Sequence, residues 1–178
     1  MNICKAAHLE LRRISSFRKY LSVDATKPLV CSLVLSQLYY CNSILSRSSQ
    51  YLFQKLKKVQ NTASKIILRV PQPKHASLLL CTLHWLSIQS RIKRKICFLC
   101  YVSLKTGSSP TYLSDLTHVY TPGKYLCSSS DTHILIIPTM KMKSYGQHSF
   151  AYQSPATWNE LPTELRHKDT VISFLKHS

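Results

Sequence analysis

Glycine and acidic residues are both scarce in this chain. Three Gly among 178 residues exclude collagen-like repeats, flexible Gly/Ser linkers and a glycine-rich phosphate cradle. The Asp and Glu residues number seven, and no two of them are adjacent, so the sequence shows no carboxylate cluster for two-metal phosphoryl transfer. It has no Gly-x-Ser-x-Gly nucleophile elbow either. We therefore expect no catalytic residue, no small-molecule substrate and no cofactor.

Long apolar runs are also lacking. The first twenty residues contain no continuous apolar stretch, so we expect no secretory signal. Residues 28–46 carry no formal charge, but several Ser, Gln and Asn side chains interrupt them, which favours a buried helix over a membrane span. The seven cysteines are odd in number and have mostly apolar neighbours, which indicates reduced thiols. These features predict an intracellular protein of the nucleus or cytoplasm.

Positive charge is abundant. Lys and Arg number 24, and the formal net charge is +17 with His neutral. Such an excess repels itself unless an anion offsets it, and nucleic acid is the usual anion, with an anionic membrane surface as the second candidate. The charge therefore predicts RNA or DNA as partner, bound through the backbone without sequence preference.

Helical periodicity dominates the chain up to residue 105. Apolar residues from Leu52 to Val70 recur at steps of three and four, and Pro71 follows as a stop. Ser87 has the position of an N-cap for a helix ending near Lys105. Further helices are expected at residues 8–20, in the segment 28–46, whose start lies at Ser22 or near Pro28, and at 76–84. We predict a mainly α fold, a small helical bundle.

A second kind of segment follows. Residues 118–148 mix Tyr, Ser, Thr, Pro and His, and predict an irregular connection with room for one hairpin. Ser154-Pro155 resembles a cap followed by the first residue of a helix, and Asp169 could cap a last helix. We therefore divide the chain into a basic helical region, 1–117, and a region of irregular structure with short C-terminal helices, 118–178.

Basic residues on the predicted helices are the best candidates for a binding site. Phosphate contacts need charge rather than base-reading geometry. Arg91 and Lys95 lie one i,i+4 step apart. The predicted nucleic-acid-binding residues are Lys57, Lys58, Lys65, Arg69, Arg91, Lys93, Arg94, Lys95, Lys141 and Lys143.

A zinc site is a weaker hypothesis. Cys81 and His84 form one short pair and Cys97 and Cys100 another, which gives four ligands of the kind that structural zinc takes. However, no glycine-rich knuckle separates the pairs, and Cys97 and Cys100 fall on the apolar side of a predicted helix, where free cysteine behaves as a small hydrophobe. We predict no metal site.

Five sequence blocks, in order, resemble one protein family. They are Leu29–Leu45 (LVCSLVLSQLYYCNSIL), Val59–Ala63 (VQNTA), Leu83–Leu86 (LHWL) followed by Arg91-Ile92, Pro110–Leu113 (PTYL), and the stretch from Tyr145-Gly146 through Ser154-Pro155 to Trp158–Pro162 (WNELP). This order and spacing resemble the region after the polymerase palm in jockey-like non-LTR retrotransposon reverse transcriptases. The likeness covers nearly the whole chain.

The resemblance implies a parent protein that copies RNA into DNA. This chain would be its thumb-side, C-terminal part. The Tyr-x-Asp-Asp hairpin that binds the catalytic metals has no counterpart here, so the resemblance implies a catalytically incomplete fragment, not an enzyme by itself, that grips a template–primer duplex or RNA.

Another class of function stays open. The apolar stripe from Leu52 to Val70 could dock a partner helix, which would make the chain a stand-alone interaction module. Phosphate binding weakens steeply with salt, whereas docking in an apolar groove is nearly indifferent to it. A zinc module is the third and weakest alternative.

Overall fold

The chain is mainly helical, as predicted. The computed structural model describes residues 2–40, 50–70, 75–105, 110–121, 133–140 and 146–167. These divide into two compact units, one ending at Arg91 and the other beginning at Ile92. The division falls inside a helix rather than at 117/118, because the later turns of that helix share a core with Leu135 and Trp158.

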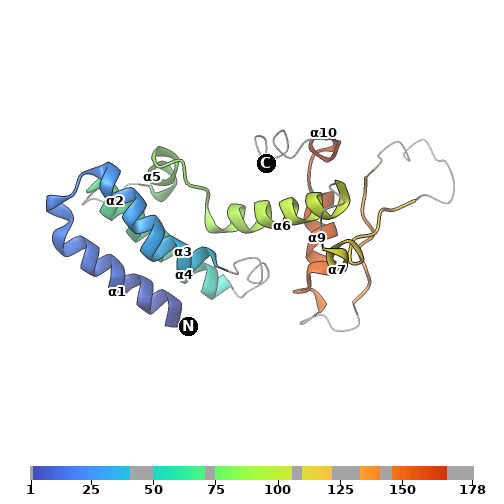
Figure 1. Ribbon diagram of the computed structural model, residues 1–178, viewed down its shortest axis with the longest axis horizontal. Helices are drawn as coiled ribbons and strands as arrows, with labels where there is room; N and C mark the ends of the chain where they lie inside the picture. The colour runs from blue at the N-terminus through green and yellow to red at the C-terminus, as the bar shows by residue number, and fades with distance from the viewer. Residues whose placement is uncertain are drawn as a thin grey trace. The chain divides into compact units, whose positions relative to one another are not determined.

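The first unit is built from helices that lie side by side (Figure 1). Its elements are α1 (Asn2–Phe17), the 3₁₀ turn η1 (Arg18–Tyr20), α2 (Val23–Val30), the π-helical turn η2 (Cys31–Leu35), α3 (Ser36–Tyr39), α4 (Gln50–Leu68) and α5 (Ala76–Thr82). α2, η2 and α3 follow one another directly and run antiparallel to α1. α4 contacts α1, α2 and α5.

The predicted cap residues begin two helices. The Ser22 side chain accepts a hydrogen bond from the Ala25 N–H at 3.1 Å, so α2 starts before Pro28 and carries this proline inside it. The alternative start near Pro28 is therefore wrong: the Ser22 cap satisfies an early donor, and the helix continues past the proline into η2. The Ser87 side chain accepts from the Ser90 N–H at 3.1 Å and begins α6 (Ile88–Lys105).

The apolar stripe of α4 forms the middle of the first core. Leu56, Val59, Ala63 and Ile67 are all at most 4% exposed. They belong to one core with buried residues of the other helices, which include Leu11 and Ile14 of α1, Val30 and Val34 of α2 and η2, and Leu79 of α5. The stripe predicted as a docking surface is thus largely covered by the chain itself.

Two helices end with non-glycine residues in the left-handed conformation. Arg69 has φ 51° and His84 has φ 56°. After α4 the Val70 N–H donates to the Lys65 carbonyl, and after α5 the Trp85 N–H donates to the Leu80 carbonyl. These are Schellman endings, at which glycine is usual. The chain's scarcity of glycine leaves larger residues in these positions.

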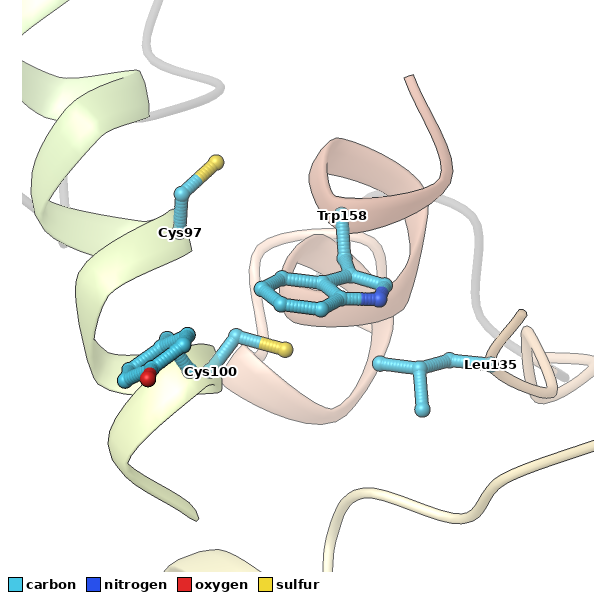
Figure 2. Packing of buried hydrophobic residues seen from close by; sticks show 5 residues of the cluster. Cys97, Cys100, Leu135 and Trp158 are labelled. Atoms are coloured by element: carbon cyan, nitrogen blue, oxygen red, sulfur yellow. The ribbon is translucent and has the colours of Figure 1, made fainter. Parts of the chain in front are cut away.

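The second unit packs α9 (Phe150–Asn159) near the later turns of α6, with α7 (Thr111–Ser114) and α10 (Thr163–Arg166) as short further helices. Its core consists of Cys97, Cys100, Tyr101, Leu135 and Trp158, all at most 3% exposed. Figure 2 shows the Trp158 indole in the middle, with the two cysteines of α6 on one side and Leu135 on the other.

The side chains of Trp158 and Asn159 hold an extended segment in place. The Trp158 Nε1–H donates to the His133 carbonyl at 2.8 Å. Asn159 accepts from the Leu135 N–H at 3.0 Å and donates to the Leu135 carbonyl at 2.9 Å, as a neighbouring strand would. Leu135 also forms an isolated antiparallel bridge with Val119. Residues 118–121 and 133–140 are otherwise irregular, as predicted for this part of 118–148.

The start of α9 differs from the prediction. The helix begins at Phe150, so Ser154 and Pro155 lie inside it and are buried. Ser149 ends a turn by donating from Oγ to the Gly146 carbonyl at 2.7 Å, and this turn sets the start. Pro155 is in the second turn of the helix, where its missing N–H removes one backbone bond. The helix predicted after Asp169 lies outside the described residues.

Candidate nucleic-acid interface

Basic side chains of α1 and α4 line a hollow between these two helices. The hollow has a volume of about 190 Å³ and is lined by Cys4, Lys5 and His8 of α1 and by Lys55 and Lys58 of α4. A shallower depression continues along α1 from Lys5 and His8 to Arg12. We call Lys5, His8, Arg12, Lys55 and Lys58 the basic groove.

Helix geometry explains why these charges gather. α1 and α4 run in the same direction, because Arg18 after α1 bonds the end of α4 and Lys5 lies beside Lys55 near their starts. Positions 5, 8 and 12 follow one another at steps of three and four, which places them on one side of α1. Positions 55, 58, 62 and 65 do the same on α4 and contain Lys55, Lys58 and Lys65. The lysines from 55 to 65 extend over about 15 Å of helix.

No carboxylate offsets the basic groove in the described part of the first unit. Its acidic residues there are Glu10 and Asp24. Glu10 pairs with Arg13 at 2.8 Å, and neither residue lines the hollow. Asp24 lies in the first turn of α2. The N-terminal ends of two parallel helices add partial positive charge near the same place. A polyanion is the ligand that relieves this repulsion best.

Arg69, predicted to bind phosphate, is exposed and makes hydrogen bonds within the protein. Its Nη2 donates to the backbone carbonyls of Arg18, Lys19 and Leu21 at 2.9 to 3.1 Å. Arg18 makes the reciprocal contacts between the segment after α1 and the end of α4. Its Nε donates to the Ile66 carbonyl at 2.9 Å, and its Nη2 donates to the Ile67 carbonyl at 2.6 Å. We call Arg18 and Arg69 the arginine clamp. It fixes the ends of α1 and α4 opposite the hollow.

The predicted pair Lys57 and Lys58 is divided between two sides of α4. Lys58 lines the basic groove, whereas Lys57 lines a different pocket that faces α5 and the start of α6. Lys65 is half-buried on the same stripe as Lys58. Residues that follow each other in a helix are rotated by about 100°, so a charge run in the sequence is not one patch in space.

Arg91 is half-buried and makes a contact within the first unit. Its guanidinium carbon is 4.0 Å from the centroid of the Tyr39 ring, a cation–π contact. Burial raises the pKa of Tyr39, while the nearby Arg91 charge partly opposes this rise. Arg91 thus has a structural contact that its sequence context gave no sign of.

The remaining predicted residues belong to the second unit or lie outside the described parts. Lys93 forms an exposed ion pair with Glu160 at 2.8 Å, Lys95 is exposed and Arg94 half-buried. Arg91 and Lys95 are one i,i+4 step apart within α6, although Arg91 belongs to the first unit and Lys95 to the second. Lys141 and Lys143 lie outside the described residues.

The structure gives no support to a zinc site. Within the described ranges, no group of three or more His, Cys, Asp or Glu side chains is placed to hold a metal ion. Cys81 is exposed, whereas Cys97 and Cys100 are core residues. Burial raises the pKa of Cys97 and of Cys100 to about 12, so both are neutral thiols near neutral pH.

The sequence prediction missed four residues of the basic groove: Lys5, His8, Arg12 and Lys55. Their signal was present as the three- and four-residue spacing on each helix. What the sequence did not contain was the parallel contact of α1 with α4, which brings the two rows together.

In the described parts of the chain, no helix is long and apolar enough to cross a membrane.

Comparison with known proteins finds no relative of this chain. No family model matches the chain, and neither the curated proteins nor the solved structures contain a match to it.

Proposed function

We propose that this chain binds the phosphate backbone of RNA or DNA, without sequence preference, through the basic groove. We further propose that it is a catalytically incomplete fragment of a non-LTR retrotransposon RNA-directed DNA polymerase, acting in the nucleus or cytoplasm. The observation that carries the binding proposal is the groove itself: five basic side chains on two parallel helices, with no acidic side chain lining it. Successive phosphates are the natural partner of such rows.

The contacts among the resembling sequence blocks support the second part. Gln60, from the VQNTA block, donates to Tyr39 Oη at 3.2 Å and to the Leu86 carbonyl at 2.8 Å. Tyr39 belongs to the first block and Leu86 to the LHWL block. Arg91, from the same block as Leu86, lies over the Tyr39 ring. Blocks that share one buried set of contacts would be retained together in a family with this fold.

A salt titration tests the binding proposal. We expect the affinity for a duplex or single-stranded oligonucleotide to fall linearly on a log–log scale, with a slope of about −0.9 per phosphate contact on duplex DNA. Arg12→Gln should weaken binding and make the slope shallower by about one contact. Arg13→Gln is the matched control: it removes the same charge from a neighbouring position that does not line the groove.

Two results would count against this proposal. The first is a protein that ignores polyanions even in dilute buffer. The second is an equal loss of affinity in Arg12→Gln and Arg13→Gln, which would mean that net charge alone, and not the groove, holds the nucleic acid.

A further inference from the structure

An exposed tyrosine lies at one end of the basic groove. Tyr51 is in the first turn of α4, and 60% of its surface is exposed. The centroid of its ring is 4.2 Å from the Nζ atom of Lys55. Lys55 lines the hollow between α1 and α4. An aromatic ring that is open to solvent is therefore in direct contact with a cation of the groove.

The helical register of α4 aligns this ring with the groove. Positions 51, 55, 58 and 62 follow one another at steps of four and three, so Tyr51 shares the face of α4 that carries Lys55 and Lys58. Tyr51 precedes Lys55 by about 6 Å along the helix axis. Lys5 of α1 lies beside Lys55 and is itself in the first turn of its helix. The ring is thus near the level at which α1 begins, where the row of lysines on α4 starts.

The chemistry of the ring suits a nucleic-acid base. The Lys55 ammonium lies over one face of the ring, and this cation–π contact favours one orientation of the side chain. Because Tyr51 is largely exposed even with this contact in place, room is left for a second, flat partner. Bases stack on such rings in proteins that hold single strands, and the backbone then follows a row of positive charge. Stacking accepts every base, which agrees with binding without sequence preference.

A duplex offers no free base to this ring. Its bases are paired and stacked on one another, and taking one out of the stack costs about as much free energy as one stacking contact returns. A duplex would therefore contact the groove through phosphates alone, whereas a single strand gains stacking in addition.

We propose that the basic groove takes single-stranded nucleic acid, with one unpaired base stacked on Tyr51 and the neighbouring phosphates at Lys55 and Lys58. This inference rests on the proposed function and deepens it, since it names the form of nucleic acid that the groove binds. The tyrosine supplies the contact with the base, and the lysines supply the contacts with the backbone.

Two strands of equal charge test this inference on the unaltered protein. One is a short oligothymidylate, and the other has the same backbone and length but abasic residues throughout. Both release the same counterions, so the slope of affinity against salt should be the same for the two. We expect the strand with bases to bind about tenfold more tightly, which corresponds to one stacking contact. Equal affinities would overturn the inference.

Substitutions of Tyr51 locate the contact. Tyr51→Leu removes the ring and should abolish the preference for the strand with bases. It should leave the affinity for the abasic strand unchanged, which shows that the groove is intact. Tyr51→Phe keeps the ring and should keep the preference.

Tyr20→Leu is the matched control. Tyr20 is 77% exposed and has the Lys19 Nζ atom 4.8 Å from its ring centroid, but it follows the other end of α1, away from Lys5. The control should keep the full preference for the strand with bases. A preference that survives Tyr51→Leu, or that Tyr20→Leu reduces equally, would overturn the inference.

The two proposals fail in different ways. Equal, salt-dependent binding of the two strands would overturn the stacking of a base on Tyr51 and support the basic groove. Binding of neither strand in dilute buffer would overturn the groove, and the inference with it.

Discussion

Arg18 and Arg69 show at the scale of single residues that positive charge serves structure as well as binding. Arg18 is 6% exposed, and burial together with the neighbouring Arg69 charge lowers its pKa. Its partners are carbonyl oxygens at the end of α4, where the helix dipole is negative. The fork-shaped guanidinium can reach several carbonyls at once, which an ammonium group cannot do.

We therefore expect Arg18→Lys to lower the free energy of unfolding by about 2 kcal/mol, because one ammonium cannot replace the hydrogen bonds to Ile66 and Ile67. Urea denaturation followed by circular dichroism measures this. Arg13→Lys, at an exposed position, should change stability by less than about 0.5 kcal/mol. Equal effects of the two substitutions would contradict the structural role of Arg18.

The buried thiols lead to a prediction about reactivity. Thiolates, not thiols, react with alkylating reagents, and the pKa of Cys97 and of Cys100 is raised to about 12 by burial. With iodoacetamide near neutral pH, exposed Cys81 should be labelled before Cys97 and Cys100, which should react only after denaturant is added. Mass spectrometry of the peptides gives the order, and early labelling of Cys97 or Cys100 would contradict the described core.

The same pKa shift makes the free energy of unfolding depend on pH. Above about pH 9, the ordinary thiol pKa, the unfolded chain releases these protons while the folded chain keeps them up to about pH 12. The unfolded state then binds fewer protons, so the free energy of unfolding should fall as pH rises through this window. Cys97→Ala should show a shallower fall than the unaltered chain in denaturation measured at several pH values. Parallel curves would speak against a neutral buried thiol at this position.

At the scale of elements, helices were predictable where a local signal set them. The Ser22 and Ser87 caps and the periodicity of α4 could be recognised in the sequence because each involves residues close together. The start of α9 was predicted wrongly at Pro155 because proline is common in the first turn of a helix. The turn that ends at Ser149 starts the helix earlier, at Phe150. The arginine clamp and the contact of Asn159 with Leu135 join residues 24 to 51 positions apart, and no local pattern predicts such pairs.

The ending of α5 offers a prediction at this scale. His84 has a left-handed backbone, which costs a residue with a Cβ atom about 1 kcal/mol relative to glycine. His84→Gly should therefore raise the free energy of unfolding by about that amount, measured by urea denaturation. His84→Ala keeps the Cβ atom and serves as the control, with no gain expected. Destabilisation by glycine would mean that the imidazole makes a contribution larger than the strain.

At the scale of the whole molecule, each compact unit contains one of the chain's two tryptophans. Trp85 lies in the first unit and Trp158 in the core of the second. The boundary could not be predicted from composition, since it falls inside a well-patterned helix whose two ends belong to different cores. The basic groove lies wholly in the first unit and the WNELP block wholly in the second.

The two units predict separate responses to core truncation. With Trp85→Phe as background, Trp158 fluorescence reports the second unit. Leu135→Ala should lower the stability seen by this probe by about 3 kcal/mol. Leu79→Ala is a comparable truncation in the first unit. It should lower the stability reported by Trp158 fluorescence much less. Equal shifts would show that the units unfold as one.

The arginine clamp has a consequence for how this protein responds to its ionic surroundings. Its donors meet peptide oxygens, buried at Arg18 and exposed at Arg69, so dissolved ions find no ionic pair there to compete with. The basic groove differs, since counterions in solution compete with its side chains for the phosphates of a nucleic acid. High salt should thus release bound nucleic acid and leave the helices intact. Basic side chains therefore serve two ends in this protein, one insensitive to salt and the other reversed by it.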